Sequence, residues 1–151
     1  GIYPKISTND LVFIGIRDLE EAEWDIIKQH QIKHFRGGID RHADTHSINF
    51  MGNYTIQQIY ESTMQHLSHC DMVYVSFDID SVDGGLVPGT GTPVKHGLSI
   101  AQAQELLINF FRNPKVCALE MVEVNPLLDT KNQTAEVAFD LINYLYYYNE
   151  D

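Results

Sequence analysis

"MVYVSFDID", residues 72 to 80, begins as an apolar run and ends in two carboxylates. The apolar part predicts a strand that is buried on both faces, as strands are in the middle of a parallel sheet. Asp78 and Asp80 stand two residues apart, and side chains with that spacing on a strand point to the same face. Two negative charges at one spot are costly unless a cation compensates them. The segment therefore predicts a buried strand whose carboxyl end can bind a metal ion.

Strand-like and helix-like segments alternate on both sides of this strand. Short apolar runs rich in β-branched residues predict further strands, at residues 10–16, 32–35 and 116–123. Helix-forming residues with apolar side chains at helical spacing predict helices, at residues 18–30, 55–69, 99–112 and 133–148. Asp18 and Ser99 are the expected N-caps of the first and third helices. The alternation predicts an α/β fold, a three-layer parallel sheet with helices on both faces.

The length of the chain and its glycine-rich segments define the expected organisation. A chain of 151 residues is expected to form a single domain, residues 1–151, with a long loop at residues 36–53. Residues 84–97 predict a second long loop. This loop lacks the G-x-x-x-x-G-K-[ST] pattern, and Pro88 and Pro93 remove backbone donors, so a phosphate-binding role is not expected.

The charge balance restricts the classes of partner. Lys and Arg number 10 against 21 Asp and Glu, a net charge of −11, which argues against nucleic acid and against an anionic membrane. An acidic surface is compatible with a cationic substrate, although it more often only keeps a protein in solution. Two cysteines are too few for a disulfide scaffold and no apolar run reaches 18 residues, so a cytoplasmic location is expected.

A second cluster of polar side chains, "DRHADTH", spans residues 40–46. Asp40, His42 and Asp44 repeat the every-other spacing of the first pair. Together the two clusters offer four carboxylates and one imidazole, an oxygen-rich set that suits Mn²⁺ and exceeds the four ligands of a tetrahedral zinc ion. Two divalent ions with bridging carboxylates would fit. The alternatives are a solvated turn or helix cap for the first cluster and a polar loop for the second.

Three segments of the sequence resemble one enzyme family. "SFDIDSVDGGLVPGTGTPVKHGLS", residues 76–99, closely resembles the ureohydrolase signature S-F-D-[IV]-D-x-x-D-P-x-x-x-P-G-T-G-T-P-x-x-G-G-L of arginases and agmatinases. "VEVNPLLDTKNQTAEVAFDLI", residues 122–142, resembles the E-V-N-P segment and final helix of that family. "DLVFIGIRDLEEAEWDIIKQHQIKHF", residues 10–35, resembles the I-G-I-R-D strand and helix of arginases. The resemblance implies an arginase-like fold.

The resemblance also implies roles for individual residues. It implies metal ligands at five positions, Asp40, His42, Asp44, Asp78 and Asp80. Glu123 and Thr92 would line the pocket for the guanidinium group of the substrate, and Glu120 would bind the substrate or support the pocket. Asp44 would orient the attacking water. His46 and His96 do not match the family's own histidine position, and they are candidates for carrying a proton to the leaving amine because histidine titrates near neutral pH.

The sequence departs from the family pattern in three ways. The family's upstream G-G-x-H-S metal motif is missing, and D-x-H-x-D follows the I-G-I-R-D strand instead of preceding it. Family members are also roughly twice as long, near the size at which a single core stops growing. We therefore expect the carboxyl-terminal half of an arginase-like fold, with its metal motif displaced into the 36–53 loop. A divided parallel sheet exposes an apolar edge, so a homo-oligomer or a complementing chain segment is expected.

The function implied by the resemblance is manganese-dependent hydrolysis of a small cationic guanidino substrate. Arginine, giving ornithine and urea, is the first expectation, with two Mn²⁺ ions activating the water. An agmatinase, a formimidoylglutamase-type ureohydrolase and a non-catalytic arginase-like fragment are the alternatives.

Overall fold

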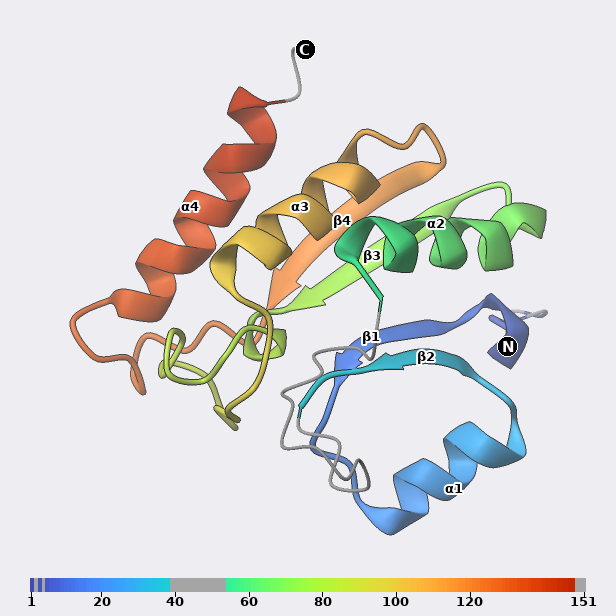
Figure 1. Cartoon of the computed structure of the whole chain (residues 1–151), viewed down its shortest axis with the longest axis horizontal. Coiled ribbons are helices and arrows are strands. Elements are labelled where there is room, and N and C mark those ends of the chain that lie inside the picture. Colours follow the sequence, from blue (N-terminus) through green and yellow to red (C-terminus); the bar gives the residue numbers. More distant parts are fainter. Residues whose placement is uncertain (2, 4, 39–53, 149–151) are drawn as a thin grey trace.

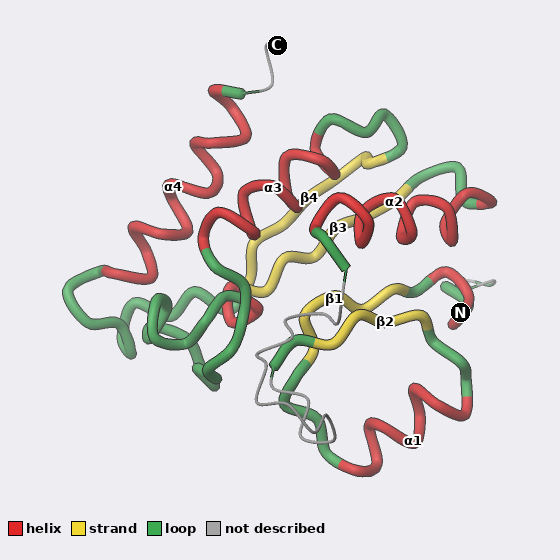
Figure 2. Tube along the Cα trace, viewed as in Figure 1, coloured by secondary structure: helices red, strands yellow, loops and turns green. Residues whose placement is uncertain are grey.

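The structure, a computed structural model, describes residues 1, 3, 5–38 and 54–148. Its strands are β1 (Val12–Ile16), β2 (Lys33–Arg36), β3 (Val73–Asp78) and β4 (Val116–Val122). Its helices are α1 (Glu21–Gln29), α2 (Ile56–His66), α3 (Ile100–Phe111) and α4 (Gln133–Tyr147), as Figure 1 and Figure 2 show. Short 3₁₀ turns lie at η1 (Thr8–Asp10), η2 (Leu67–His69) and η3 (Ile79–Ser81). Every predicted strand and helix is present, which confirms the α/β class.

All the strand pairs are parallel within the described residues. β1 pairs with β2, and β3 pairs with β4 in a register that sets Asp78 opposite Val122. α3 provides the crossover between β3 and β4, as the parallel arrangement requires. One detail differs from the expected single sheet, because the described strands form two separate two-stranded sheets. Just after β1, the side chain of Arg17 donates to the carbonyl of Val82, which follows β3 and the turn η3, so this bond joins the segments at the carboxyl ends of the two sheets.

The helices begin where local hydrogen bonds satisfy their first backbone N–H groups. Ser99 caps α3 in a reciprocal box with Gln102, which confirms the predicted cap. The cap predicted at Asp18 is wrong, because α1 begins after Glu20. The backbone N–H of Glu20 donates to Glu23 at 2.8 Å, so a capping box placed two residues later takes over. α1 therefore begins where a capping box forms, with Glu20 as the N-cap residue.

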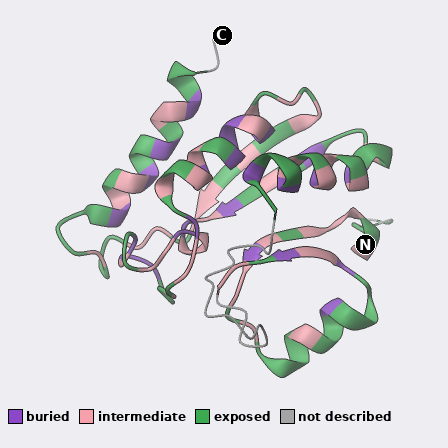
Figure 3. Cartoon of the chain, in the orientation of Figure 1, coloured by how far each residue is buried: buried purple, intermediate pink, exposed green. Residues whose placement is uncertain are grey.

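The main core lies between α2, α3, α4 and the β3–β4 sheet (Figure 3). α3 packs on both α2 and α4, and its Leu107 is 1% exposed. Replacing such a buried leucine by alanine typically lowers the free energy of unfolding by about 2–5 kcal/mol. The core extends to Ile79, which is 0% exposed and stands directly between Asp78 and Asp80. The backbone that carries the two carboxylates is therefore anchored in the main core.

One face of the β3–β4 sheet is exposed, contrary to the expectation of a strand buried on both faces. Val73 and Phe77 of β3 are buried, whereas Tyr74 and Ser76, which alternate with them, are exposed. Glu120, the ladder partner of Ser76, is exposed as well. In the part of the chain that the structure describes, helices thus cover this sheet on one side. Over the same residues, no helix is both long and apolar enough to span a membrane.

Candidate active site

Asp78 and Asp80 come together at the carboxyl end of β3. Asp78 is the last residue of the strand, and Asp80 lies in the 3₁₀ turn η3 that follows. The backbone N–H of Asp80 donates to Oδ1 of Asp78 at 3.0 Å, so the first carboxylate caps the turn that holds the second. The two side chains are therefore brought together by a turn and not by the alternation of a strand, on which the prediction rested. The predicted proximity of the two residues is confirmed.

A cavity of about 210 Å³ opens beside this pair. It is lined by residues from the end of β1, the end of β3 and the glycine-rich loop that follows. The polar side chains in its wall are those of Arg17, Asp18, Asp78, Asp80, Ser81 and Thr92. Ligands of parallel α/β sheets bind at this end of the strands, beyond their carboxyl ends. The cavity therefore lies where the topology predicts a site.

Thr92 links the glycine-rich loop to the carboxylate pair. Its hydroxyl donates to Oδ2 of Asp80 at 3.3 Å. The loop itself is shaped by Asp83, whose carboxylate accepts from the backbone N–H groups of Gly85 at 2.9 Å and His96 at 2.5 Å. The pKa of Asp83 is lowered: these backbone hydrogen bonds outweigh its desolvation, the largest single influence, which acts in the opposite direction. Asp83 thus organises the loop that presents Thr92.

Glu123 reaches the same region from β4. It follows the strand directly and has a left-handed backbone conformation, with φ of 64°. A residue other than glycine rarely adopts this backbone conformation, and residues with such strain are concentrated at functional sites. A Cβ atom built on Gly91 would lie 3.9 Å from Oε2 of Glu123, so the carboxylate lies beside the Thr92 loop.

The carboxylates repel one another in a half-buried setting. The pKa of Asp78 is raised, first by desolvation and then by the negative charges of Asp80 and Glu123, although the backbone N–H of Asp80 acts to lower it. A divalent cation at this place would relieve the repulsion and provide charge that the residues lack. Two close carboxylates are also hard oxygen ligands, which Mn²⁺ and Mg²⁺ prefer. The chemistry of Asp78 and Asp80 fits a metal ion.

Arg17 is the site residue that the sequence reasoning missed. Its guanidinium group donates to three backbone carbonyls around the cavity, those of Asp80, Val82 and Val94. Desolvation lowers its pKa, while the charges of Asp80 and other nearby carboxylates act to raise it. The signal in the sequence is an arginine placed directly after a buried strand. Arg17 binds β1 to both segments that carry the site.

Glu120 of β4, which the resemblance placed near the substrate, has its hydrogen-bond partners in β3. It accepts a hydrogen bond from the Ser76 hydroxyl at 2.9 Å. Its pKa is lowered first by the hydrogen bond from Tyr74 and then by that from Ser76. Its contact with substrate stays a prediction.

The loop half of the predicted site lies outside the described residues. This part of the chain contains Asp40, His42, Asp44 and His46, so their roles stay predictions. Within the ranges 5–38 and 54–148, no third Asp, Glu, His or Cys forms a metal-sized group with Asp78 and Asp80. The described residues thus supply two of the five predicted ligands.

Known proteins resemble this chain along almost all of it. The family model described as "Arginase family" matches residues 2–147. An arginase of Bacillus subtilis (strain 168) is 34% identical over 145 residues, which make up 96% of this chain and 45% of that protein. The solved structure of an arginase from Bacillus cereus has a TM-score of 0.80 at 36% identity, with 97% of this chain and 47% of that chain covered. An arginase of Entamoeba histolytica in complex with L-ornithine has a TM-score of 0.78 at 25% identity, over 93% of this chain and 44% of that chain.

The chain spans about half the length of the relatives that it matches. The matched range includes the carboxylate pair at the end of β3, the loop that carries Thr92 and the strained Glu123. On this match, the chain belongs to the arginase family.

Proposed function

We propose that this protein takes part in the manganese-dependent hydrolysis of a guanidino substrate, with arginine converted to ornithine and urea. The proposal rests on one observation above all, the convergence of Asp78, Asp80 and Glu123 at the carboxyl ends of β3 and β4. A cluster of carboxylates can bind both metal cations and a cationic substrate. The similarity to arginases supports arginine as that substrate.

The metal ligands in this proposal come from two parts of the chain. Asp78 and Asp80 contribute carboxylate oxygens from the end of β3. Asp40, His42 and Asp44 are proposed to complete the set, which is large enough for two Mn²⁺ ions. When bound, such ions lower the pKa of a coordinated water so that hydroxide is available near neutral pH.

The other residues bind and orient. In the proposal, the Glu123 carboxylate accepts charge-assisted hydrogen bonds from the guanidinium nitrogens of the substrate. The Thr92 hydroxyl holds the side chain of Asp80 in one orientation. In the proposal, Asp44 accepts a hydrogen bond from the attacking water, and His46 donates a proton to the leaving amine.

Two related functions are the alternatives. An agmatinase or a formimidoylglutamase-type ureohydrolase would use the same metal chemistry on a different amidino compound. A non-catalytic arginase-like fragment would keep the fold and lack turnover. The resemblance of "IGIRD" and "EVNPLLDT" to arginases favours arginine.

The state of assembly and the location also belong to the proposal. The exposed face of the β3–β4 sheet, with Tyr74 58% and Met72 71% exposed, favours a cover supplied by a second copy or by a complementing chain segment. A sheet face with such apolar side chains gains stability when it is covered. A cytoplasmic location stays a prediction.

The test is a substrate comparison on Mn²⁺-loaded protein. Urea release from arginine and from agmatine and product release from formimidoylglutamate are measured side by side, with the Asp80→Asn variant as the negative control. Turnover of arginine above the other two supports the proposal. Preferential turnover of another substrate would replace arginine by that compound. No turnover of any of the three, in protein that retains Mn²⁺, would leave the non-catalytic alternative.

A further inference from the structure

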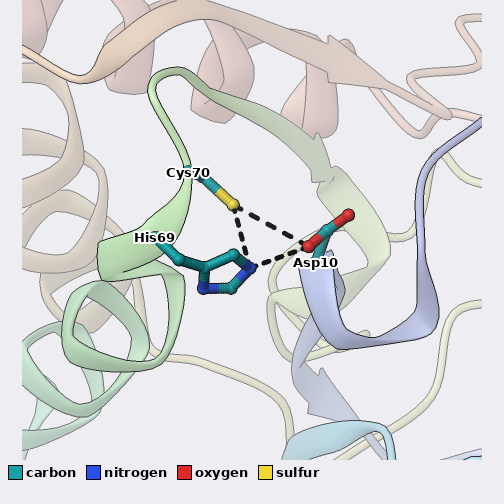
Figure 4. Close-up of side chains that lie close together, drawn as sticks. All are labelled: Asp10, His69 and Cys70. Carbon is teal, nitrogen blue, oxygen red and sulfur yellow. Dashed lines mark hydrogen bonds and ion pairs between the residues drawn. The ribbon is translucent and has the colours of Figure 1, made fainter. Parts of the chain in front are cut away.

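A second group of ligand-type side chains lies at the opposite ends of the strands. Asp10, in the turn η1, stands just before β1, while His69 and Cys70 stand at the end of η2, just before β3 (Figure 4). Nε2 of His69 lies 2.8 Å from Oδ1 of Asp10 and 3.5 Å from Sγ of Cys70. Sγ of Cys70 lies 4.0 Å from the same Asp10 oxygen. A carboxylate, an imidazole and a thiol therefore surround one point, far along β3 from Asp78.

The orientation of the His69 ring is set by its other nitrogen. Nδ1 lies 3.1 Å from the backbone carbonyl of His66, an acceptor, so this nitrogen carries the ring proton. In a neutral imidazole, Nε2 then directs its lone pair at the Asp10 carboxylate and the Cys70 sulfur. The Cys70 thiol can donate its S–H to one of these acceptors, and a metal ion in place of that proton would bind all three ligand atoms. A backbone carbonyl bonded to the far nitrogen is also the usual support of a metal-binding histidine.

The separations of the three atoms are close to those around a tetrahedral zinc ion. Bond lengths of about 2.0–2.1 Å to N and O and 2.3 Å to S place the N and O ligands roughly 3.3 Å apart and each of them roughly 3.6 Å from S. The observed sulfur distances of 3.5 and 4.0 Å bracket the second value. The N–O distance of 2.8 Å must open by about half an ångström. The His69 side chain is 53% exposed and the Asp10 side chain 33%, so both have room to make this adjustment.

A neighbouring histidine of the same helical segment has a ring nitrogen without a hydrogen bond. Nε2 of His66 is buried and has no hydrogen-bond partner among the described residues.

We propose that Asp10, His69 and Cys70 bind one Zn²⁺ ion, with a water molecule in the fourth position. A mixed carboxylate, imidazole and thiolate set suits zinc, whereas thiolate does not suit Mn²⁺. Residues 10 and 69 are 59 positions apart in the chain, and they precede strands of two different sheets. The ion therefore cross-links β1 to β3 at their amino ends, where no backbone ladder joins them. This zinc site is separate from the carboxylate pair at the other end of β3.

Cobalt titration of the whole chain tests this inference. Co²⁺ substitutes for Zn²⁺ and gives a near-ultraviolet thiolate-to-metal absorption, which a site without cysteine cannot produce. We expect the absorption at saturation to have the intensity of one thiolate-bound Co²⁺ per chain, whatever Co²⁺ the carboxylates also bind. It should disappear when Zn²⁺ is added, because Zn²⁺ binds such ligands more tightly than Co²⁺. Cys70→Ser should abolish the absorption. His69→Ala should weaken Co²⁺ binding by at least roughly 100-fold, the upper end of the loss seen when even a supporting partner of a ligand is removed.

The second cysteine offers a matched control. Cys117 is exposed in β4 and donates to the carbonyl of Val73, so Cys117→Ser should keep the cobalt absorption unchanged. The rise in thermal midpoint that Zn²⁺ causes should be larger in wild type and in Cys117→Ser than in Cys70→Ser, because the proposed Mn²⁺ site is present in all three. Circular dichroism shows whether each variant is folded. No thiolate absorption in the wild type, an absorption that depends on Cys117, or binding that is unaffected by His69→Ala would each overturn the inference. Any of these results leaves the Mn²⁺ proposal untouched.

Discussion

The hydroxyl of Thr92 donates to the carboxylate of Asp80 at 3.3 Å, and this bond joins the glycine-rich loop to the end of β3. The two residues are 12 positions apart, and the backbone between them turns around Asp83. The loop therefore fixes the orientation of a proposed metal ligand, while β3 fixes its position. A site formed in this way depends on the contacts that hold the loop as much as on the ligands themselves.

Replacement of Arg17 should loosen the site without removing a ligand. Arg17→Met leaves the backbone carbonyls of Asp80 and Val82 without the guanidinium donor, while that of Val94 still accepts from the N–H of Gly84. Each unsatisfied buried acceptor costs roughly 1–3 kcal/mol. We expect a lower free energy of unfolding in urea and weaker Mn²⁺ binding, with partial recovery of both in Arg17→Lys. Unchanged stability in Arg17→Met would mean that water replaces the guanidinium.

Replacement by alanine should change the stability of the protein differently at two glycines of the loop, Gly97 and Gly91. A Cβ atom on Gly97 would lie 2.5 Å from the backbone carbon of Val82 and 2.6 Å from the nitrogen of Asp83. Backbone cannot move aside easily, so Gly97→Ala should lower the free energy of unfolding by roughly 1–3 kcal/mol or more. Gly91→Ala is the matched control, since its nearest neighbour, Oε2 of Glu123, would lie at 3.9 Å. Equal midpoints in urea for the two variants would contradict this packing.

The repulsion at Asp78 should be visible in the stability of metal-free protein. The pKa of Asp78 is raised by desolvation, Asp80 and Glu123, so the folded state holds this proton more tightly than the unfolded state. Its contribution to stability is therefore greatest at acidic pH and is lost as the pH rises from about 4, the ordinary Asp value, through the raised pKa. Asp78→Asn keeps an oxygen that can accept from the Asp80 N–H and removes the charge.

In the presence of a chelator, Asp78→Asn should unfold at a higher temperature than wild type at pH 7, by roughly 2–4 °C for each kcal/mol of repulsion removed. The difference should shrink as the pH falls toward 4. The same variant should bind Mn²⁺ more weakly, because it lacks a ligand. Thermal unfolding followed by circular dichroism at several pH values checks the first part. A lower midpoint for Asp78→Asn at pH 7 would show that the charge is already compensated within the protein.

The sequence predicted the elements well because each depends on local patterns. The cap at Ser99 could be predicted because it is local: the box that Ser99 forms with Gln102 spans four adjacent residues. The cap of α1 was misplaced at Asp18 because Glu20 can close an equivalent box, and two overlapping signals do not reveal which one forms. The proximity of Asp78 and Asp80 was predicted for the wrong reason, since a turn brings them together.

What the sequence did not reveal depends on contacts between distant segments. Arg17 bonds to carbonyls more than 60 residues away, and no local pattern indicates which carbonyls lack donors. Asp10 meets His69 only because β1 and β3 begin at the same end of the fold. The exposure of one face of β3 was not predicted either, because apolar residues such as Met72 and Tyr74 suggest a strand that is covered on both faces.

Glu123 should matter for turnover and not for metal content. Glu123→Gln keeps the size of the side chain and removes the charge that would bind the guanidinium. The loss of one charge-assisted hydrogen bond is worth roughly 1.5–3 kcal/mol, so we expect kcat/KM for arginine to fall about 10- to 100-fold. Glu105→Gln, at an exposed position of α3, is the matched control. A loss of bound Mn²⁺ in Glu123→Gln would instead make Glu123 a metal ligand or a structural support.

The number of Mn²⁺ ions bound per chain tests the proposed binuclear site most directly. Equilibrium dialysis and elemental analysis on the Cys70→Ser background, which removes the proposed zinc site, should give two Mn²⁺ ions per chain. Asp78→Ala and Asp44→Ala on that background should both lose most of the bound metal, because the proposal places ligands from β3 and from the 40–46 segment around the same two ions. Loss in Asp78→Ala with full retention in Asp44→Ala would separate "DRHADTH" from the site. Full retention of Mn²⁺ in Asp78→Ala would contradict a metal centre at the end of β3.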